Sequence, residues 1–250
     1  MRQKSEETIN FLLKQAEQKC QDFQPTNDKS HCTFMVTILW QPDNDDVKVQ
    51  GHMFSTLTPM DMKSSLSSTP LTAAIALDPD LALPNRFQNA PEAKLIAWCR
   101  TRRPLEEKFK ISGVNEILLT RRRELQVEIL EGLTSNVFVL YPGGRLRTCE
   151  TDDSVLGGYA RHLVIQAAEA CDLTIDIGPI HIEEAGLWQA VFLTSSIRVI
   201  GPVGEIILPD SDGSSKSLWR LSDVSRKDAA NSLVWKQLLS EIYRTVRSKG

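Results

Sequence analysis

The stretch from residue 115 to residue 148 constrains the fold most, because it holds four runs of strand-forming residues in close succession. The runs are NEILLT, QVEILEG, SNVFVLY and RLRT, and they are separated by RRREL, by LT and by PGG. Short apolar and β-branched runs between turn-forming residues are typical of strands joined by hairpins. We therefore expect an antiparallel meander over residues 115–148.

Hydrophobic spacing predicts further helices and strands around this stretch. They are a strand at 71–77, a helix over 91–110, a helix over 156–173, two strands joined by a bend over 190–203, and a helix over 232–246. Pro104 lacks the N–H that a helix interior needs, so it is expected to interrupt the helix over 91–110. Gly157 and Gly158 form a glycine loop that leads into the helix over 156–173.

The first part of the chain is expected to form a small α/β unit. Residues 5–19 carry apolar residues at helical spacing, and the strand-forming runs 32–40 and 47–54 flank the turn QPDNDD. The segment 55–70 is rich in Ser, Thr and Pro, which is typical of a linker. The predicted architecture is therefore α/β (α+β), with a shortened N-terminal subdomain at 1–66 and a larger domain at 67–250.

Composition and charge argue against several classes of partner. With 41% hydrophobic residues among 250, the chain can bury a substantial core. The net charge of −3 and the pI near 5.9 give no electrostatic reason to bind nucleic acid or an anionic membrane. The arginines at 100, 102, 103 and 121–123 lack interleaved aromatic residues, so we expect them to be solvated on a helix face and a hairpin tip.

Cysteines, histidines and apolar runs bear on compartment and metal chemistry. The five cysteines are an odd number without a close pair, which favours a reducing compartment over a disulfide framework. The histidines lack metal-ligand spacing, so no metal site is expected. The N-terminus is charged throughout and no long apolar run follows it, so we expect a cytoplasmic protein. The sequence contains neither a Gly-x-Ser-x-Gly elbow nor a P-loop, so no motif supports a hydrolase or a nucleotide-binding enzyme.

Four features of the larger domain are candidates for chemistry: Lys94, Glu131, the Gly157-Gly158 helix start and the hydroxyl-rich bend at 194–196. Each has a simpler reading, because Lys94 could be a solvated lysine and Glu131 a strand-end carboxylate in solvent. The hydroxyls of the bend could satisfy only local backbone groups. Together, however, they match what pyridoxal phosphate requires: a lysine amine, an acid facing the pyridine nitrogen, and a phosphate cup of amides and hydroxyls.

Residues 94 to 203 resemble the class IV aminotransferases, the fold-type IV pyridoxal-phosphate enzymes that include branched-chain aminotransferase, D-amino-acid aminotransferase and aminodeoxychorismate lyase. The resemblance rests on EGLTSNVFVL, VLGGYARHLVI and VFLTSSIRVIGPV, which occur in the family's order. The segment PEAKLIAWCRTRRPLE looks most like a plant-type branch of the family. The resemblance implies a larger domain built around a barrel-like β-sheet with flanking helices.

The resemblance also implies a role for individual residues. Lys94 would be the Schiff-base lysine and the proton shuttle at the substrate α-carbon, and Glu131 would face the pyridine nitrogen of the cofactor. Leu156 would pack beneath the ring.

The phosphate would be held by the amides of Tyr159 and Ala160 and by the hydroxyl of Ser196. Ala160 stands where the family usually has Thr, and little is lost there if the backbone amide makes the contact.

The implied function is that of a pyridoxal-phosphate-dependent transaminase or lyase acting on an amino acid or an aminated chorismate-like substrate, in a homodimer. The family has a phosphate-binding arginine upstream of the helix matched to residues 5–19, and this chain begins after that point. Two alternatives follow: an N-terminally shortened form of an enzyme, or a catalytically inactive relative that serves as a binding or interaction module.

Overall fold

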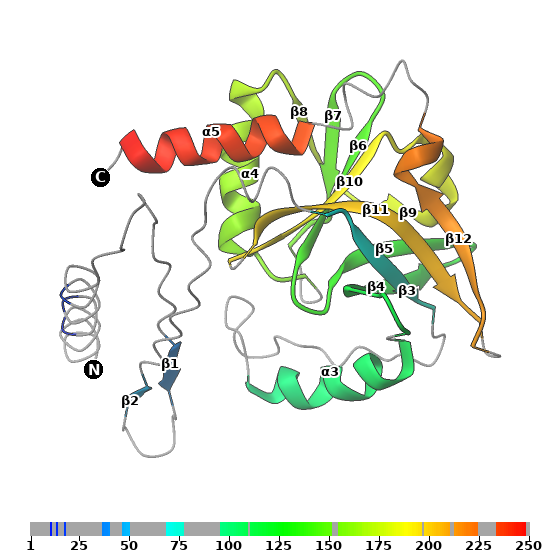
Figure 1. The fold of residues 1–250 in the computed structure, drawn as a ribbon, viewed down its shortest axis with the longest axis horizontal. Helices are drawn as coiled ribbons and strands as arrows, with labels where there is room; N and C mark the ends of the chain where they lie inside the picture. The colour runs from blue at the N-terminus through cyan, green and yellow to red at the C-terminus, as the bar shows by residue number, and fades with distance from the viewer. Residues whose placement is uncertain are drawn as a thin grey trace. The chain divides into compact units, whose positions relative to one another are not determined.

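The computed structural model in Figure 1 divides into two compact units, Met1–Ser67 and Ser68–Gly250. The structure describes residues 37–40, 47–50, 69–77, 96–109, 111–151, 155–196, 198–210, 213–224 and 234–248, together with positions 11, 14 and 18.

The first unit contains the expected hairpin. Strands β1 (Thr37–Trp40) and β2 (Val47–Gln50) pair antiparallel, with Thr37 opposite Gln50. Phe11, Lys14 and Gln18 are helical, in keeping with the helix expected over 5–19, whose other residues lie outside the described part of the chain.

The second unit is built on one ten-stranded mixed sheet with the order β8-β7-β6-β10-β11-β3-β4-β5-β9, and β12 pairs with β11. Strand β3 runs parallel to β4 and β11, and β7 runs parallel to β8, whereas the other pairs are antiparallel. The strands are β3 (Leu71–Ala76), β4 (Glu116–Arg123), β5 (Gln126–Gly132), β6 (Asn136–Tyr141), β7 (Arg145–Thr148), β8 (Thr174–Ile177), β9 (Ile180–His181), β10 (Ala190–Ser195), β11 (Val199–Pro209) and β12 (Ser215–Arg220).

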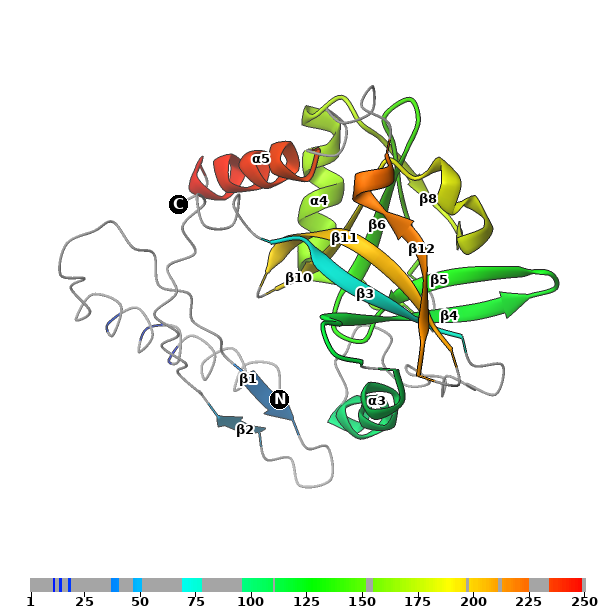
Figure 2. The ribbon, with the colours of Figure 1, turned by 45° about the vertical axis from the view of Figure 1, so that its right-hand side comes forward.

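Helices flank this sheet. Figures 1 and 2 show α4 and α5 packed against each other at one side of the sheet, and α3 on another side near β3. The helices are α3 (Ile96–Phe109), α4 (Tyr159–Ala170) and α5 (Val234–Ser248), with short 3₁₀ helices η2 (Ile182–Leu187) and η3 (Leu221–Asp223). A large sheet with few helices confirms the predicted α/β class.

The expected meander over 115–148 is only partly correct. Strands β4 and β5 pair, as do β6 and β7, but β10, β11, β3 and β4 lie between β6 and β5 in the sheet order. Every residue of β6 is buried, so the strand needs a partner on each edge, and β10 supplies the second. The chain nevertheless joins β5 to β6 by a tight loop in which Gly132 N donates to Ser135 O at 2.7 Å. The sheet therefore curves so that β5 and β6 come close together, in keeping with the barrel-like sheet that the resemblance implies.

Of two local expectations near the arginine clusters, one was wrong and the other was only partly correct. Pro104 lies inside α3 without ending it, because the following turns bury Leu105 and Phe109 in the core and this packing outweighs the lost hydrogen bond. The arginines at 121–123 belong to β4, and the turn falls at Glu124, whose φ is 53°. Arg121 is not merely solvated there, because it donates to the buried Glu128 at 2.8 Å.

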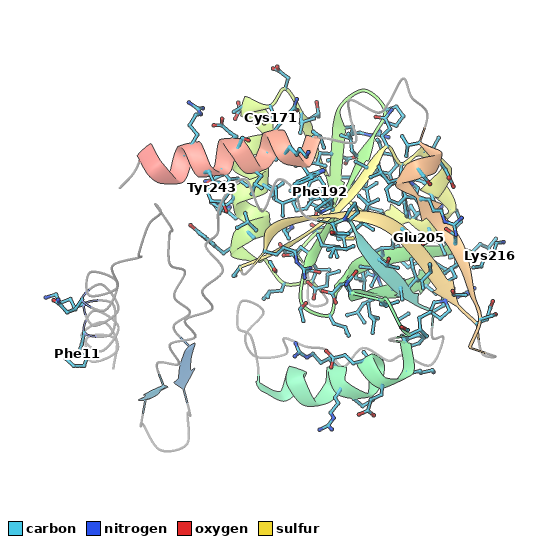
Figure 3. All side chains as sticks on the ribbon, viewed as in Figure 1. Phe11, Cys171, Phe192, Glu205, Lys216 and Tyr243 are labelled. Atoms are coloured by element: carbon cyan, nitrogen blue, oxygen red, sulfur yellow. The ribbon has the colours of Figure 1, made fainter. Side chains whose placement is uncertain are left out.

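The core of the unit lies between the strands and their flanking helices. Figure 3 shows Phe192 among the packed side chains, where its ring stacks on that of Phe138 at a centroid distance of 5.2 Å. Among the described residues, no helix is both long and apolar enough to cross a membrane. No group of three or more potential metal ligands occurs in that part of the chain either.

Candidate active site

Glu131 lies near the end of β5 and is 4% exposed, so the reading of this residue as a strand-end carboxylate in solvent is wrong. Its Oε2 accepts hydrogen bonds from Asn136 Nδ2 at 3.1 Å and from the backbone N–H of Leu156 at 3.0 Å. Asn136 Nδ2 also donates to the carbonyl of Leu156 at 2.7 Å. These contacts fix Glu131 to the segment that leads into α4.

Arg161 supplies positive charge near this carboxylate. It lies in the first turn of α4, is 7% exposed, and its Nη2 donates to the carbonyl of Cys149 at 2.8 Å. Burial lowers the pKa of the Arg161 guanidinium, while electrostatic interactions with Cys149 and Glu131 act to raise that pKa. A buried carboxylate with two N–H donors and a nearby cation is stabilised as the anion.

The N-terminus of α4 has no side-chain cap. Gly158 is the N-cap, and no side chain of the N-cap bonds the first turn, which also contains no acidic residue. The first amides of a helix without a cap bond, aligned with the positive end of the helix dipole, favour a negatively charged group. Tyr159 directs an exposed side chain to solvent, whereas Ala160 is buried.

Gly158→Ala is expected to lower the free energy of unfolding by about 1–3 kcal/mol, because the new Cβ would collide with Oδ1 of Asn136. Displacement of Asn136 would also loosen Glu131. Gly157→Ala is the matched control, since its Cβ would meet only Thr151 Cγ2 at an ordinary 3.6 Å. Denaturant unfolding of both variants checks this, and equal losses of stability would contradict it.

The three hydroxyl side chains expected in a bend at 194–196 differ in position and in hydrogen bonding, because Thr194 and Ser195 end β10 and Ser196 lies in the turn that follows. Thr194 pairs with Asn136 across the β6–β10 ladder, and its buried hydroxyl has no hydrogen-bond partner among the described residues. Ser195 Oγ accepts from the N–H of Arg198 at 3.2 Å, which is the local role considered for this bend. Ser196 is exposed in the turn.

The structure thus brings some of the predicted site residues together. Glu131 contacts Leu156 directly, and two glycines connect Leu156 to Tyr159 and Ala160. Ser196 follows two residues after Thr194, the strand partner of Asn136. Lys94 lies outside the described residues.

Glu116 is a buried acid that the sequence analysis missed. It is 7% exposed at the start of β4 and accepts from the hydroxyls of Thr134 at 2.6 Å and Ser135 at 2.8 Å. A Cβ on Gly132 would come within 2.9 Å of Glu116 Cγ, which explains why the Glu-Gly pair of this loop needs glycine. The only sign in the sequence is a carboxylate at the head of an otherwise apolar strand.

Comparison with solved structures finds the same fold. A branched-chain amino acid aminotransferase from Thermobaculum terrenum, M3 mutant, matches 82% of this chain and 56% of its own with a TM-score of 0.54 at 16% identity. The PLP-form (holo-form) of the Thermobaculum terrenum enzyme matches 75% of this chain and 54% of its own, with a TM-score of 0.51 at 17% identity. A hypothetical aminotransferase from Mycobacterium tuberculosis, apo form, matches 78% and 61%, with a TM-score of 0.50 at 18% identity.

At these identities the structural matches show the fold alone, and the chain spans less than two thirds of the length of each of these relatives. A search of curated proteins found no match. A sequence model of the family "Amino-transferase class IV", by contrast, matches residues 4–206, which is most of the chain. The chain therefore belongs to the class IV aminotransferase family.

Proposed function

We propose that this chain is a pyridoxal-phosphate-dependent enzyme acting on the amino group of an amino acid or an aminated chorismate-like compound. The observation that carries the proposal is the buried Glu131, which is held by Asn136 and by Leu156, on the segment that leads into the uncapped N-terminus of α4. An anion and an anion-binding helix end lie on adjacent segments, which suits a ligand with a cationic ring and a phosphate.

The residues present fit that cofactor. Glu131 would hold the proton-bearing pyridine nitrogen, and Leu156 would lie beneath the ring. The amides of Tyr159 and Ala160 and the hydroxyl of Ser196 would bind the phosphate. When bound, pyridoxal phosphate supplies an electron sink for the electrons released at the substrate α-carbon.

The protein itself would supply orientation and proton transfer. Lys94 would anchor the cofactor through its amine and then move the proton at the substrate α-carbon. Asn136 would keep the Glu131 carboxylate in place, since its side chain bonds both Glu131 and the backbone of Leu156.

The test is an absorbance titration of the purified protein with pyridoxal phosphate. A new band that saturates with added cofactor is expected, and a spectrum equal to the sum of the separate components would overturn the proposal. The inactive-relative alternative would give a saturating band with no turnover of any amino acid tested.

Transfer and elimination can then be told apart by their co-substrate. An aminotransferase must pass the amino group to a 2-oxo acid, so turnover would stop without that acceptor. A lyase releases its product without one, so turnover in the absence of any 2-oxo acid would assign elimination.

Two structural proposals accompany this function. Residues 67–250 would form the cofactor-binding domain, and two chains would associate as a homodimer, as the family resemblance implies. A monomer mass in light scattering at micromolar concentration would contradict the dimer.

A further inference from the structure

A second buried acid, Glu116, accepts hydrogen bonds from the loop between β5 and β6. Both of its hydroxyl donors, Thr134 and Ser135, lie in the middle of this loop, and the N–H of Ile117 adds a third hydrogen bond at 3.1 Å. No salt bridge to Glu116 occurs among the described residues. A buried carboxylate is stabilised by its hydrogen bonds, so these donors help to hold Glu116 and the loop together.

The ends of the same loop carry the candidate active-site groups. Glu131 precedes the loop and Asn136 follows it, and both bond to Leu156. The backbone closes the loop through Gly132 N to Ser135 O at 2.7 Å and attaches it to β4 through Leu133 N to Ile117 O at 2.9 Å. Movement of residues 133–135 would therefore move Glu131 and Asn136 with them.

We propose that Glu116 is a positioning residue of the active site, which acts through Thr134 and Ser135 to hold Glu131 and Asn136 against the Leu156 segment. Its effect on cofactor binding rests on the proposed function, whereas its effect on the loop does not. A site held in place before the ligand arrives binds more tightly, because less order has to be imposed on binding.

The experiment compares Glu116→Met with Glu128→Met. Both remove a buried carboxylate from the β4–β5 pair, but Glu128 bonds Arg121 rather than the loop. Hydrogen exchange in the cofactor-free protein is measured at the amides of Gly132, Leu133 and Leu156, each normalised to the amides of β6. Glu116→Met is expected to accelerate this exchange about tenfold, the equivalent of one lost hydrogen bond, and Glu128→Met less than about twofold.

Milder variants keep the proposal testable if Glu116→Met fails to fold. Thr134→Val removes the shorter of the two hydroxyl bonds, and Glu116→Gln keeps one acceptor oxygen, so each should give a smaller acceleration at the same amides. Combining Thr134→Val with Glu116→Met should add little, because both changes break the same contact.

A titration with pyridoxal phosphate completes the test. Glu116→Met is expected to bind the cofactor about tenfold more weakly than the wild type, and Glu128→Met within about twofold. Unchanged exchange at the three amides in Glu116→Met, or equal acceleration in Glu116→Met and Glu128→Met, would show that Glu116 does not position the active site. A wild type that takes up no cofactor would defeat the proposed function, while the exchange result would still decide the role of Glu116.

Discussion

Lys94→Ala is expected to abolish the absorbance band that appears when the wild type is titrated with pyridoxal phosphate, and to reduce turnover by roughly three orders of magnitude or more. The alanine side chain offers no amine to anchor the cofactor and none to move the proton at the substrate α-carbon. The amides of α4 that are proposed to bind the phosphate would remain, so the variant should still bind the cofactor weakly and reversibly.

Lys108→Ala is a suitable control for this change. Lys108 lies in the last turn of α3, with its ammonium 5.3 Å from the centroid of the Phe109 ring. Its removal should leave both the band and the turnover within a factor of two of the wild type. A band that survives in Lys94→Ala would assign the anchoring amine to a different lysine.

The sequence predicted individual strands better than their partners. Strands β5 and β7 have the bounds expected from QVEILEG and RLRT, because alternation and turn residues are local signals. The second partner of β6 is β10, which comes some fifty residues later in the chain, and no local pattern specifies such a pairing. Pro104 failed as a helix breaker for a similar reason, since burial of Leu105 and Phe109 depends on the rest of the fold.

In the candidate site, too, the local motifs could be predicted from the sequence, whereas the contacts that depend on the rest of the fold could not. The motif around Glu131 and the glycines before α4 could be identified from the sequence, and the contact between Glu131 and Leu156 joins them in the structure. The burial of Arg161 could not be predicted, because an arginine in the first turn of a helix is usually solvated. Glu116 was missed for the same reason, since a single acid does not reveal which hydroxyls will reach it.

The surroundings of Glu131 change how its charge is explained. If a cationic cofactor ring were the only group that stabilises the ionised Glu131 carboxylate, this stabilisation would exist only when the cofactor is bound. The two N–H donors and the nearby Arg161 guanidinium instead favour the ionised carboxylate in the protein itself. We therefore expect the site to present an anion before any cofactor arrives, which would favour the protonated form of the ring nitrogen.

Glu131→Gln is accordingly expected to preserve the fold and to remove most turnover, by about a hundredfold or more. The amide oxygen can still accept from Leu156 N and Asn136 Nδ2, whereas the attraction to Arg161 is lost, at about 1 kcal/mol of unfolding free energy. The amide carries no negative charge, so the pyridine nitrogen would no longer be held protonated even if Lys94 still anchors the cofactor. Glu128→Gln, at a position equally buried, should affect stability without affecting turnover. Turnover of Glu131→Gln within a factor of two of the wild type, on a substrate that the wild type accepts, would show that this carboxylate only stabilises the end of β5.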